Sequence, residues 1–267
     1  MCRMLMHYIL VIAVKIERVF RRQKIKIINK SALNNLKGKS APIIFAPTHC
    51  GKYDIQVLAE VLWDFKWSLL SGDPYELPGT IEGVWLKLNG VVYVDRDNKE
   101  YRKRAKKQLI DLLMRGENIM LYPEGTWNFS ANLPVLPLFR GVADIAASTN
   151  AIIVPFGLEI DDKTNTYYVM IGKPIVPDNE PLVILEKLRD QMATLKWQLF
   201  EKLYNYSIRY DNETLISDWE KYIEKRLSEC RYMSYELIWK YSRKESWQME
   251  REKNISDIDR LRGENVD

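Results

Sequence analysis

The sequence predicts an α/β fold with a mostly parallel mixed sheet flanked by helices, and three observations support it. From Ser40 to about Pro177, short β-branched or apolar runs alternate with segments of helical apolar spacing, which is typical of parallel strands joined by helices. Before this region, the apolar run from Met4 to Val14 predicts an N-terminal interfacial helix. After Pro181, an apolar stripe at helical spacing predicts a C-terminal helical extension.

The expected domain organisation follows these three regions. Residues 1–35 form an N-terminal amphipathic, membrane-associated segment, residues 36–180 form the α/β domain, and residues 181–267 form the C-terminal helical extension. With 267 residues and 46% hydrophobic content, the chain is long enough to bury one sizeable core.

Six segments rich in β-branched and apolar residues are expected to be strands. They are Ile43 to Ala46, Trp67 to Leu70, Val91 to Val94, Ile119 to Tyr122, Ile152 to Phe156 and Tyr167 to Ile171. The helices expected between them are Asp54 to Phe65, Ile81 to Leu88, Glu100 to Met114 and Gly141 to Ser148. The turn from Asp161 to Asn165 resembles a hairpin and predicts antiparallel pairing at one edge of the sheet. In the C-terminal extension, a second helical stretch is expected from about Thr214 through Tyr241.

The N-terminal segment combines an apolar run with a basic cluster. The run from Met4 to Val14 is too short to span a bilayer, and no small-residue cleavage pattern follows it, so a signal peptide is not expected. The basic residues that follow are Arg18, Arg21, Arg22, Lys24, Lys26 and Lys30. This combination is typical of an interfacial anchor and predicts a peripheral or monotopic protein at the cytoplasmic face of a membrane. The alternative is a helix packed on the domain with a solvated basic end.

Charge and cysteine content narrow the function classes. A net charge of +4 is too small to argue for nucleic-acid binding. The three cysteines, Cys2, Cys50 and Cys230, form neither a disulfide framework nor a metal-binding spacing. The two histidines lie far apart in the sequence, which excludes a histidine-rich metal site. We therefore expect a reduced environment, no metal and no cofactor.

His49 is the residue best suited to proton transfer, because an unperturbed imidazole has a pKa of about 6.5. It lies between a predicted strand and a predicted helix, where an open α/β sheet usually binds its ligand. A turn followed by the first helical turn lets Asp54 fold back toward the imidazole, so that its carboxylate holds one ring nitrogen and leaves the other as a base. The alternative is an aspartate favoured near a helix start by the helix dipole.

Two further loops at strand ends carry polar side chains. One holds Glu124, which supplies a carboxylate, Gly125, which permits a positive φ and backbone N–H groups directed at an anion or hydroxyl, and Thr126, which adds a hydroxyl. The other holds Arg96, whose guanidinium can bind phosphate through two parallel hydrogen bonds. Each loop alone is also compatible with an ordinary turn, or with a surface ion pair between Asp95 and Arg96.

Taken in chain order, these segments resemble the glycerolipid acyltransferase family, which includes the lysophosphatidic acid acyltransferases. The resemblance covers about residues 36 to 177. The segments that carry it are Thr48-His49-Cys50-Gly51-Lys52-Tyr53-Asp54, Gly90-Val91-Val92-Tyr93-Val94-Asp95-Arg96, Tyr122-Pro123-Glu124-Gly125-Thr126 and Ile153-Val154-Pro155-Phe156. Their order and spacing together are far more specific than any single segment.

The resemblance implies transfer of a fatty acyl group to a hydroxyl of a lysophosphatidate-like glycerolipid, in phospholipid biosynthesis. Acyl-CoA or acyl-carrier protein would be the co-substrate. His49 would be the general base and Asp54 its orienting partner, and the acceptor hydroxyl would attack the thioester directly, without a covalent acyl-enzyme. The residues that would bind the acceptor and its phosphate are Arg96, Glu124, Gly125 and Thr126.

Three positions depart from the family pattern. Thr48 stands where asparagine is common, Gly51 where serine is common, and Trp127 where arginine is usual. The missing arginine removes one expected phosphate contact, although Arg140 aligns with a position that is often lysine and would supply positive charge. Trp127 and Pro155 are candidates for lining the acyl or acceptor pocket. Trp127 also favours the alternative of a sugar or a less charged lipid head group as acceptor.

Two rival readings remain. Cys50, beside His49, suggests a cysteine nucleophile, but neighbouring side chains usually diverge, which favours a structural thiol. A non-catalytic lipid-binding scaffold would suit the terminal segments, but it needs none of His49, Asp54 and Glu124.

One basic run falls on the third predicted helix. Its residues are Lys99, Arg102, Lys103, Arg104, Lys106 and Lys107. The run indicates either a solvated helix face or a surface for anionic lipid head groups or an acidic carrier protein.

Overall fold

One mixed sheet of seven strands organises the computed structural model, which describes residues 2–38, 40–72, 74–75, 77–128, 133–178, 180–203, 221, 224–225 and 228. The strands are β1 (Lys24–Ile28), β2 (Ile43–Pro47), β3 (Trp67–Ser71), β4 (Val91–Tyr93), β5 (Asn118–Met120), β6 (Ile152–Asp161) and β7 (Thr166–Ile171). Their order across the sheet is β1-β7-β6-β2-β5-β3-β4. The predicted fold class is confirmed.

Strands β2 to β6 run parallel, and β7 returns antiparallel to β6. The predicted hairpin is therefore present, but β7 is not an edge strand, because β1 pairs with it in parallel from Lys24 to Ile28. The sheet thus begins before residue 36, within the stretch assigned to the N-terminal segment. In that stretch lysines alternate with isoleucines, and the lysines are exposed while the isoleucines are partly buried. This is the period-two pattern of a strand, so the lysines predicted to belong to a basic cluster lie on the exposed side of β1.

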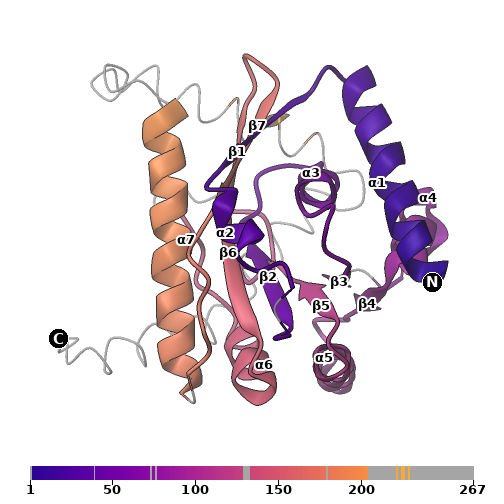
Figure 1. Cartoon of the computed structure of the whole chain (residues 1–267), viewed down its shortest axis with the longest axis vertical. Coiled ribbons are helices and arrows are strands. Elements are labelled where there is room, and N and C mark those ends of the chain that lie inside the picture. Colours follow the sequence, from indigo (N-terminus) through magenta and orange to yellow (C-terminus); the bar gives the residue numbers. More distant parts are fainter. Residues whose placement is uncertain are drawn as a thin grey trace.

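Helices cover both faces of the sheet (Figure 1). They are α1 (Cys2–Phe20), α2 (Ser31–Asn34), α3 (Asp54–Val61), α4 (Ile81–Asn89), α5 (Lys99–Met114), α6 (Gly141–Thr149) and α7 (Pro181–Leu203), with a short 3-10 helix at Leu77–Gly79. Helices α5, α6 and α7 pack on one face, and α1, α2 and α3 pack on the other. In Figure 1, α7 stands on the left and α1 on the right, beside α4.

Alternating side chains of β2 divide the core between these two layers. Ile44 and Ala46 pack toward α5, α6 and α7, whereas Ile43 and Phe45 pack toward α3. Because β2 lies in the middle of the sheet and is covered on both faces, all five of its residues are buried. This explains why the strand reads as a continuous apolar run rather than as an alternating one.

Helix α1 packs one side against α3 and α4 and exposes apolar residues on the other. His7, Val11 and Val14 are buried, and the ring of His7 meets Trp67 edge to face. The large apolar residues exposed on α1 are Leu5, Ile9, Ile12, Ile16, Val19 and Phe20. Among the described residues, no helix combines the length and the apolar character needed to cross a bilayer.

Helix α7 belongs to the same core, although it begins beyond the expected boundary at residue 180. It packs on β6, β7 and α6, and Leu185, Leu188 and Leu199 are fully buried. The first part of the predicted C-terminal extension is therefore a layer of the domain. The second helical stretch, predicted from Thr214 through Tyr241, lies almost wholly outside the described residues.

Candidate active site

His49 and Asp54 meet in the turn between β2 and α3. His49 Nδ1 lies 2.9 Å from Asp54 Oδ2, as the spacing predicted. Asp54 is the first residue of α3 and is only 1% exposed. Its carboxylate also accepts hydrogen bonds from the backbone N–H groups of Cys50, at 2.8 Å, and Gly51, at 3.0 Å. These donors fix the carboxylate, so the carboxylate in turn fixes the imidazole.

The surroundings of His49 keep its imidazole neutral. Burial lowers the pKa of His49 from its ordinary value, the hydrogen bond and charge of Asp54 oppose that shift, and the positive charge of Arg96 lowers the pKa further. Because Nδ1 faces a carboxylate, it carries the ring proton, which leaves Nε2 as the basic nitrogen. A neutral ring with a free Nε2 is the form that accepts a proton.

Two aromatic rings from the loop after β5 border the imidazole. Tyr122 stacks on His49 with ring centroids 3.5 Å apart, and Trp127 lies 6.1 Å away at a tilt of 43°. Trp127 is partly buried. An indole therefore lies beside His49 at the position where the family usually has arginine. Sequence reasoning gave Tyr122 no role, since a tyrosine ending an apolar strand resembles a core residue.

Arg96, in the loop after β4, lies over Gly72, which directly follows β3. A Cβ atom built on Gly72 would lie 2.2 Å from Arg96 Nη2, so the missing side chain makes room for the guanidinium. The charge of Arg96 acts on His49 from this place. The structure thus brings Arg96 toward the His49 site. Gly72 was not singled out in the sequence, because the pattern around it is that of an ordinary turn.

Glu124 and Gly125 shape the loop after β5. Glu124 is 1% exposed, and its Oε2 accepts a hydrogen bond from the Leu136 N–H at 2.9 Å. Gly125 has a φ of +71°, as its place in a turn suggested, and it packs so closely on Phe139 that a Cβ atom would lie 2.5 Å from the ring. In this structure both residues hold the loop in place; their predicted role in acceptor binding stays a prediction.

Three other predicted residues lie in different settings. Thr126 is 2% exposed, and its hydroxyl makes no hydrogen bond with the described residues. Pro155 is buried within β6, beside Ala46 of β2, so it lies in the sheet. Arg140 precedes α6 and its Nε lies 3.1 Å from Asp144 Oδ1. None of these contacts involves His49 or Asp54, so the predicted roles of the three residues in binding stay predictions.

Cys50 has its side chain turned toward Asp54. It is 5% exposed, and its Sγ lies 3.3 Å from Asp54 Oδ1. Such a thiol helps to fix the carboxylate. This geometry favours the structural reading of Cys50 over the nucleophile.

Comparisons with known proteins place the region that carries this site in a family. A family model described as acyltransferase covers residues 24–159, about half of the chain, and includes His49, Asp54, Arg96 and Glu124. The chain belongs to the acyltransferase family. Two similar relatives are both chloroplastic 1-acyl-sn-glycerol-3-phosphate acyltransferases. The one from Arabidopsis thaliana is 28% identical over 131 residues, and the one from Brassica napus is 26% identical over 126 residues.

These matches cover only part of each plant relative. They span 49% and 47% of this acyltransferase-family chain, and 35% of each relative. A solved structure adds evidence on the fold. The 1-acyl-sn-glycerophosphate acyltransferase from Thermotoga maritima aligns with a TM-score of 0.58 and 14% identity, over 72% of this chain and 78% of that one. The shared fold includes the sheet that carries the site.

Proposed function

We propose that this chain transfers a fatty acyl group from a thioester donor to the hydroxyl of a lysophosphatidate-like glycerolipid. The observation that carries the proposal is the His49–Asp54 contact of 2.9 Å at the carboxyl end of β2. His49 Nε2 takes the proton from the acceptor hydroxyl as the hydroxyl oxygen attacks the thioester carbonyl. When the tetrahedral intermediate collapses, the C–S bond breaks. The imidazolium of His49 then gives its proton to the departing sulfur, which leaves as a thiol. Asp54 stabilises the imidazolium between these steps.

The proposed mechanism needs no covalent intermediate, because the acceptor supplies the nucleophilic oxygen. The thiol of Cys50, which follows His49 in the chain, is hydrogen-bonded to Asp54. Stacking on Tyr122 covers one face of the imidazole. The acceptor must therefore approach Nε2 at the ring edge, or from the side of Trp127.

Arg96 is the residue proposed to bind the acceptor phosphate. Its guanidinium lies over Gly72, close enough to His49 for its charge to lower the pKa of the imidazole. The two plant relatives named above act, by their descriptions, on 1-acyl-sn-glycerol-3-phosphate, which carries such a phosphate. Trp127 supports a second candidate, a less charged lipid acceptor, because an indole offers apolar contact rather than a phosphate contact.

The acyl donor is proposed to be acyl-CoA or acyl-carrier protein. Both carry negative charge, and α5 presents exposed basic residues at Arg102, Lys103, Arg104 and Lys107. The helix begins beside the Arg96 loop, where Arg102 Nη1 donates to the Arg96 carbonyl oxygen at 2.6 Å. Charge reversal at Lys103 and Lys107 should raise the KM for acyl-carrier protein. An unchanged KM would show that α5 does not bind the acyl donor.

An acyl-transfer assay with a panel of acceptors tests the proposed function. Purified protein receives labelled acyl-CoA or acyl-carrier protein with lysophosphatidate, glycerol-3-phosphate, a lysophospholipid or a neutral glycolipid. Product from lysophosphatidate that is absent in His49→Ala and present in Cys50→Ala is the expected result. Product only from another acceptor would keep the mechanism and change the substrate. If a folded protein that still binds lipid gave no product from any acceptor, the result would favour the alternative of a non-catalytic lipid-binding scaffold.

The exposed side of α1 supports membrane association of this chain. Its apolar residues recur at helical spacing from Leu5 to Phe20, and Phe20 is 84% exposed. Val84 and Leu88 of α4, which packs beside α1, are exposed as well. Basic residues Arg22 and Lys24 follow directly. We expect this surface to enter the interface of an anionic bilayer.

Flotation with liposomes tests that surface. Replacing Ile12 and Ile16 by aspartate should abolish binding to vesicles that contain anionic lipid, because two charges would enter the apolar interface. Val176→Asp is the matched control, since Val176 is 71% exposed and lies away from α1 in the sequence. Equal flotation of both variants would contradict the assignment.

A further inference from the structure

A buried ion pair lies next to the His49 segment and plays no part in the mechanism above. Lys196 of α7 is 5% exposed, Glu159 of β6 is 1% exposed, and Lys196 Nζ lies 2.5 Å from Glu159 Oε2. A pair buried this deeply adds little net stability, because the cost of desolvating both charges offsets their attraction. The other contacts of the ammonium indicate what else the pair does.

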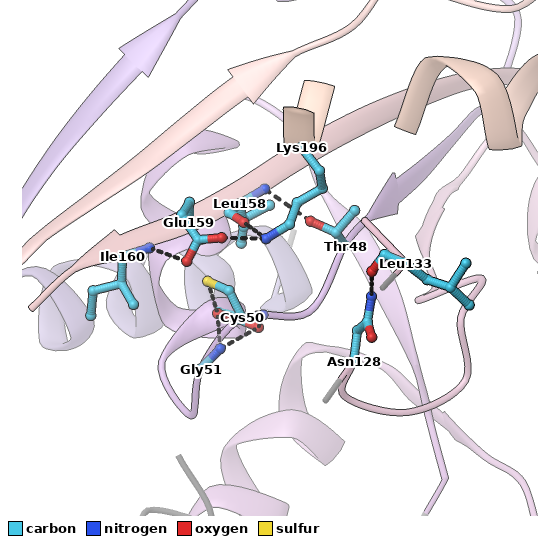
Figure 2. Close-up of polar contacts among 10 residues, drawn as sticks. Thr48, Cys50, Gly51, Asn128, Leu133, Leu158, Glu159, Ile160 and Lys196 are labelled. Carbon is cyan, nitrogen blue, oxygen red and sulfur yellow. Dashed lines mark hydrogen bonds and ion pairs between the residues drawn. The ribbon is translucent and has the colours of Figure 1, made fainter. Parts of the chain in front are cut away.

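The backbone of one residue, Leu158, connects Lys196 to Thr48, the residue before His49. Lys196 Nζ donates to the Leu158 carbonyl oxygen at 2.8 Å, and the Leu158 N–H donates to Thr48 Oγ1 at 2.9 Å. Thr48 also donates its own N–H to the Phe156 carbonyl oxygen at 2.9 Å. In Figure 2, dashed lines join the ammonium to Glu159 and Leu158, and Thr48 and Cys50 lie nearby. Thr48 is thus held at two points on β6.

Strand length explains why these contacts exist. β2 ends at Pro47, which pairs with Phe156, whereas β6 continues to Asp161. Beyond Phe156, the backbone groups of β6 that face β2 have no strand to pair with. Buried backbone groups need partners, and the Thr48 hydroxyl and the Lys196 ammonium supply them for Leu158. The loop that carries His49 therefore begins where Lys196 of α7 binds a backbone group of β6 that no strand pairs with.

Gly157 lets α7 come close enough for this contact. A Cβ atom on Gly157 would lie 2.8 Å from Leu195 Cβ and 3.2 Å from Leu199 Cδ1. With no side chain there, α7 packs directly on β6, and Lys196 reaches the edge of the strand. Larger residues at this position would push the helix, and the ammonium with it, away from Leu158.

The ammonium keeps its charge in this setting. Burial opposes the charged form, but Glu159, together with Cys50 and Glu124, raises the pKa of Lys196 above the ordinary value for lysine. Cys50 binds Asp54, and Glu124 holds the loop after β5. The fixed positive charge therefore lies near both loops that form the site.

We propose that Lys196, held by Glu159, is a positioning residue for His49 that acts through the backbone of Leu158 and through Thr48. The proposal rests on the role of His49 as the general base. Lys196 lies outside the residues matched by the family model, which end at residue 159. The helical layer after the matched region thus takes part in orienting the base.

The test uses the full chain with both charges removed together, in Lys196→Met/Glu159→Gln, so that no unpaired charge stays buried. We expect kcat to fall about 10- to 100-fold, with KM for both substrates little changed, because misplacing a catalytic group affects the reaction rather than binding. Thr48→Val should reduce kcat similarly, and Thr48→Ser should restore it. Lys187→Met is the control, since Lys187 of α7 forms a half-exposed ion pair with Asp178, which precedes the helix.

A second readout needs no substrate. The chain has two histidines, so the imidazole ¹⁵N spectrum contains the two ring nitrogens of His49 and those of His7 alone. In the wild-type protein we expect the single tautomer with the proton on Nδ1. In the double variant and in Thr48→Val we expect a mixture of tautomers and faster exchange of that proton. If the proposed acyl transfer failed for every acceptor, this measurement would still decide the positioning role.

Combining the changes tests the connection itself. If Lys196 and Thr48 act through the same residue, Leu158, adding Thr48→Val to the double variant should cost less than the product of the separate losses. Losses that multiply would overturn the proposal, as would a folded double variant with unchanged kcat and an unchanged His49 tautomer. If the double variant fails to fold, Gly157→Ala is used instead, because its added methyl group should move α7 and Lys196 away from Leu158. Unchanged His49 resonances in Gly157→Ala would also overturn the proposal.

Discussion

The imidazole of His49 lies flat against the phenol ring of Tyr122, with the ring planes 7° from parallel. Asp54 holds the same imidazole at Nδ1. The stacking on Tyr122 thus fixes the plane of the imidazole, and the hydrogen bond to Asp54 fixes its rotation within that plane. Since the two restraints act in different directions, they set the direction of Nε2 without any contact to Nε2 itself.

Tyr122→Leu should lower kcat about tenfold, because it removes a stacking contact of about 1 kcal/mol that orients the base. Tyr122→Phe is the matched control, since it keeps the ring. The Tyr122 hydroxyl is buried and makes no hydrogen bond with the described residues, so its loss should leave kcat and Tm unchanged or raise Tm slightly. Equal loss of kcat in both variants would show that the hydroxyl, not the stacked ring, matters.

Asp54→Asn should reduce kcat by a factor on the order of 10³ to 10⁴, because an amide cannot hold the Nδ1–H tautomer or stabilise the imidazolium. The pKa of His49 should fall further, since Asp54 raises it. Steady-state kinetics and histidine NMR titration measure the two effects. Combining His49→Ala with Asp54→Asn should cost no more than His49→Ala alone; an added loss would mean that Asp54 acts independently of His49.

The acid limb of kcat/KM should lie below the ordinary histidine value of about 6.5. Burial lowers the pKa of His49, so the neutral, active ring persists as the pH falls, and activity is lost only when the pH passes below that lowered pKa. The limb reports the free enzyme. A limb above the ordinary value would assign the base to another group.

Arg96→Gln should move that limb to higher pH, because the charge of Arg96 lowers the pKa of His49. The same variant should raise KM for a phosphorylated acceptor and leave KM for a neutral one unchanged. Profiles of kcat/KM against pH for both acceptors check the two effects together. A higher KM for both acceptors would indicate a general distortion of the loop.

Gly125→Ala should destabilise the fold by about 1–3 kcal/mol, because a left-handed φ is strained for alanine and the added Cβ would meet Phe139. Gly116→Ala is the control: its φ is +76°, and its Cβ would have no atom within 4 Å. Urea denaturation of both variants separates the backbone cost from the clash. Equal losses would mean that Phe139 moves aside without cost.

Much of the fold could be predicted because its signals are local. The runs at 43–46 and 67–70 are strands, and helices begin at Asp54 and Ile81 as expected, since apolar periodicity reflects burial within one element. Boundaries were less accurate, as α3 ends at Val61 rather than Phe65. β1 was missed because its pairing with β7 lies about 140 residues away in the chain, and its own five residues carry more lysine than a core strand does.

The sequence by itself predicted the His49–Asp54 contact, because a turn that leads into a helix lets the two side chains, five positions apart, fold back toward each other. Only the tertiary structure decided that Tyr122 stacks on His49, that Arg96 lies over Gly72, and that Lys196 reaches Leu158. Those contacts join separate strands and helices. Their geometry depends on strand register and on how closely α7 packs on β6, which no local spacing along the chain encodes.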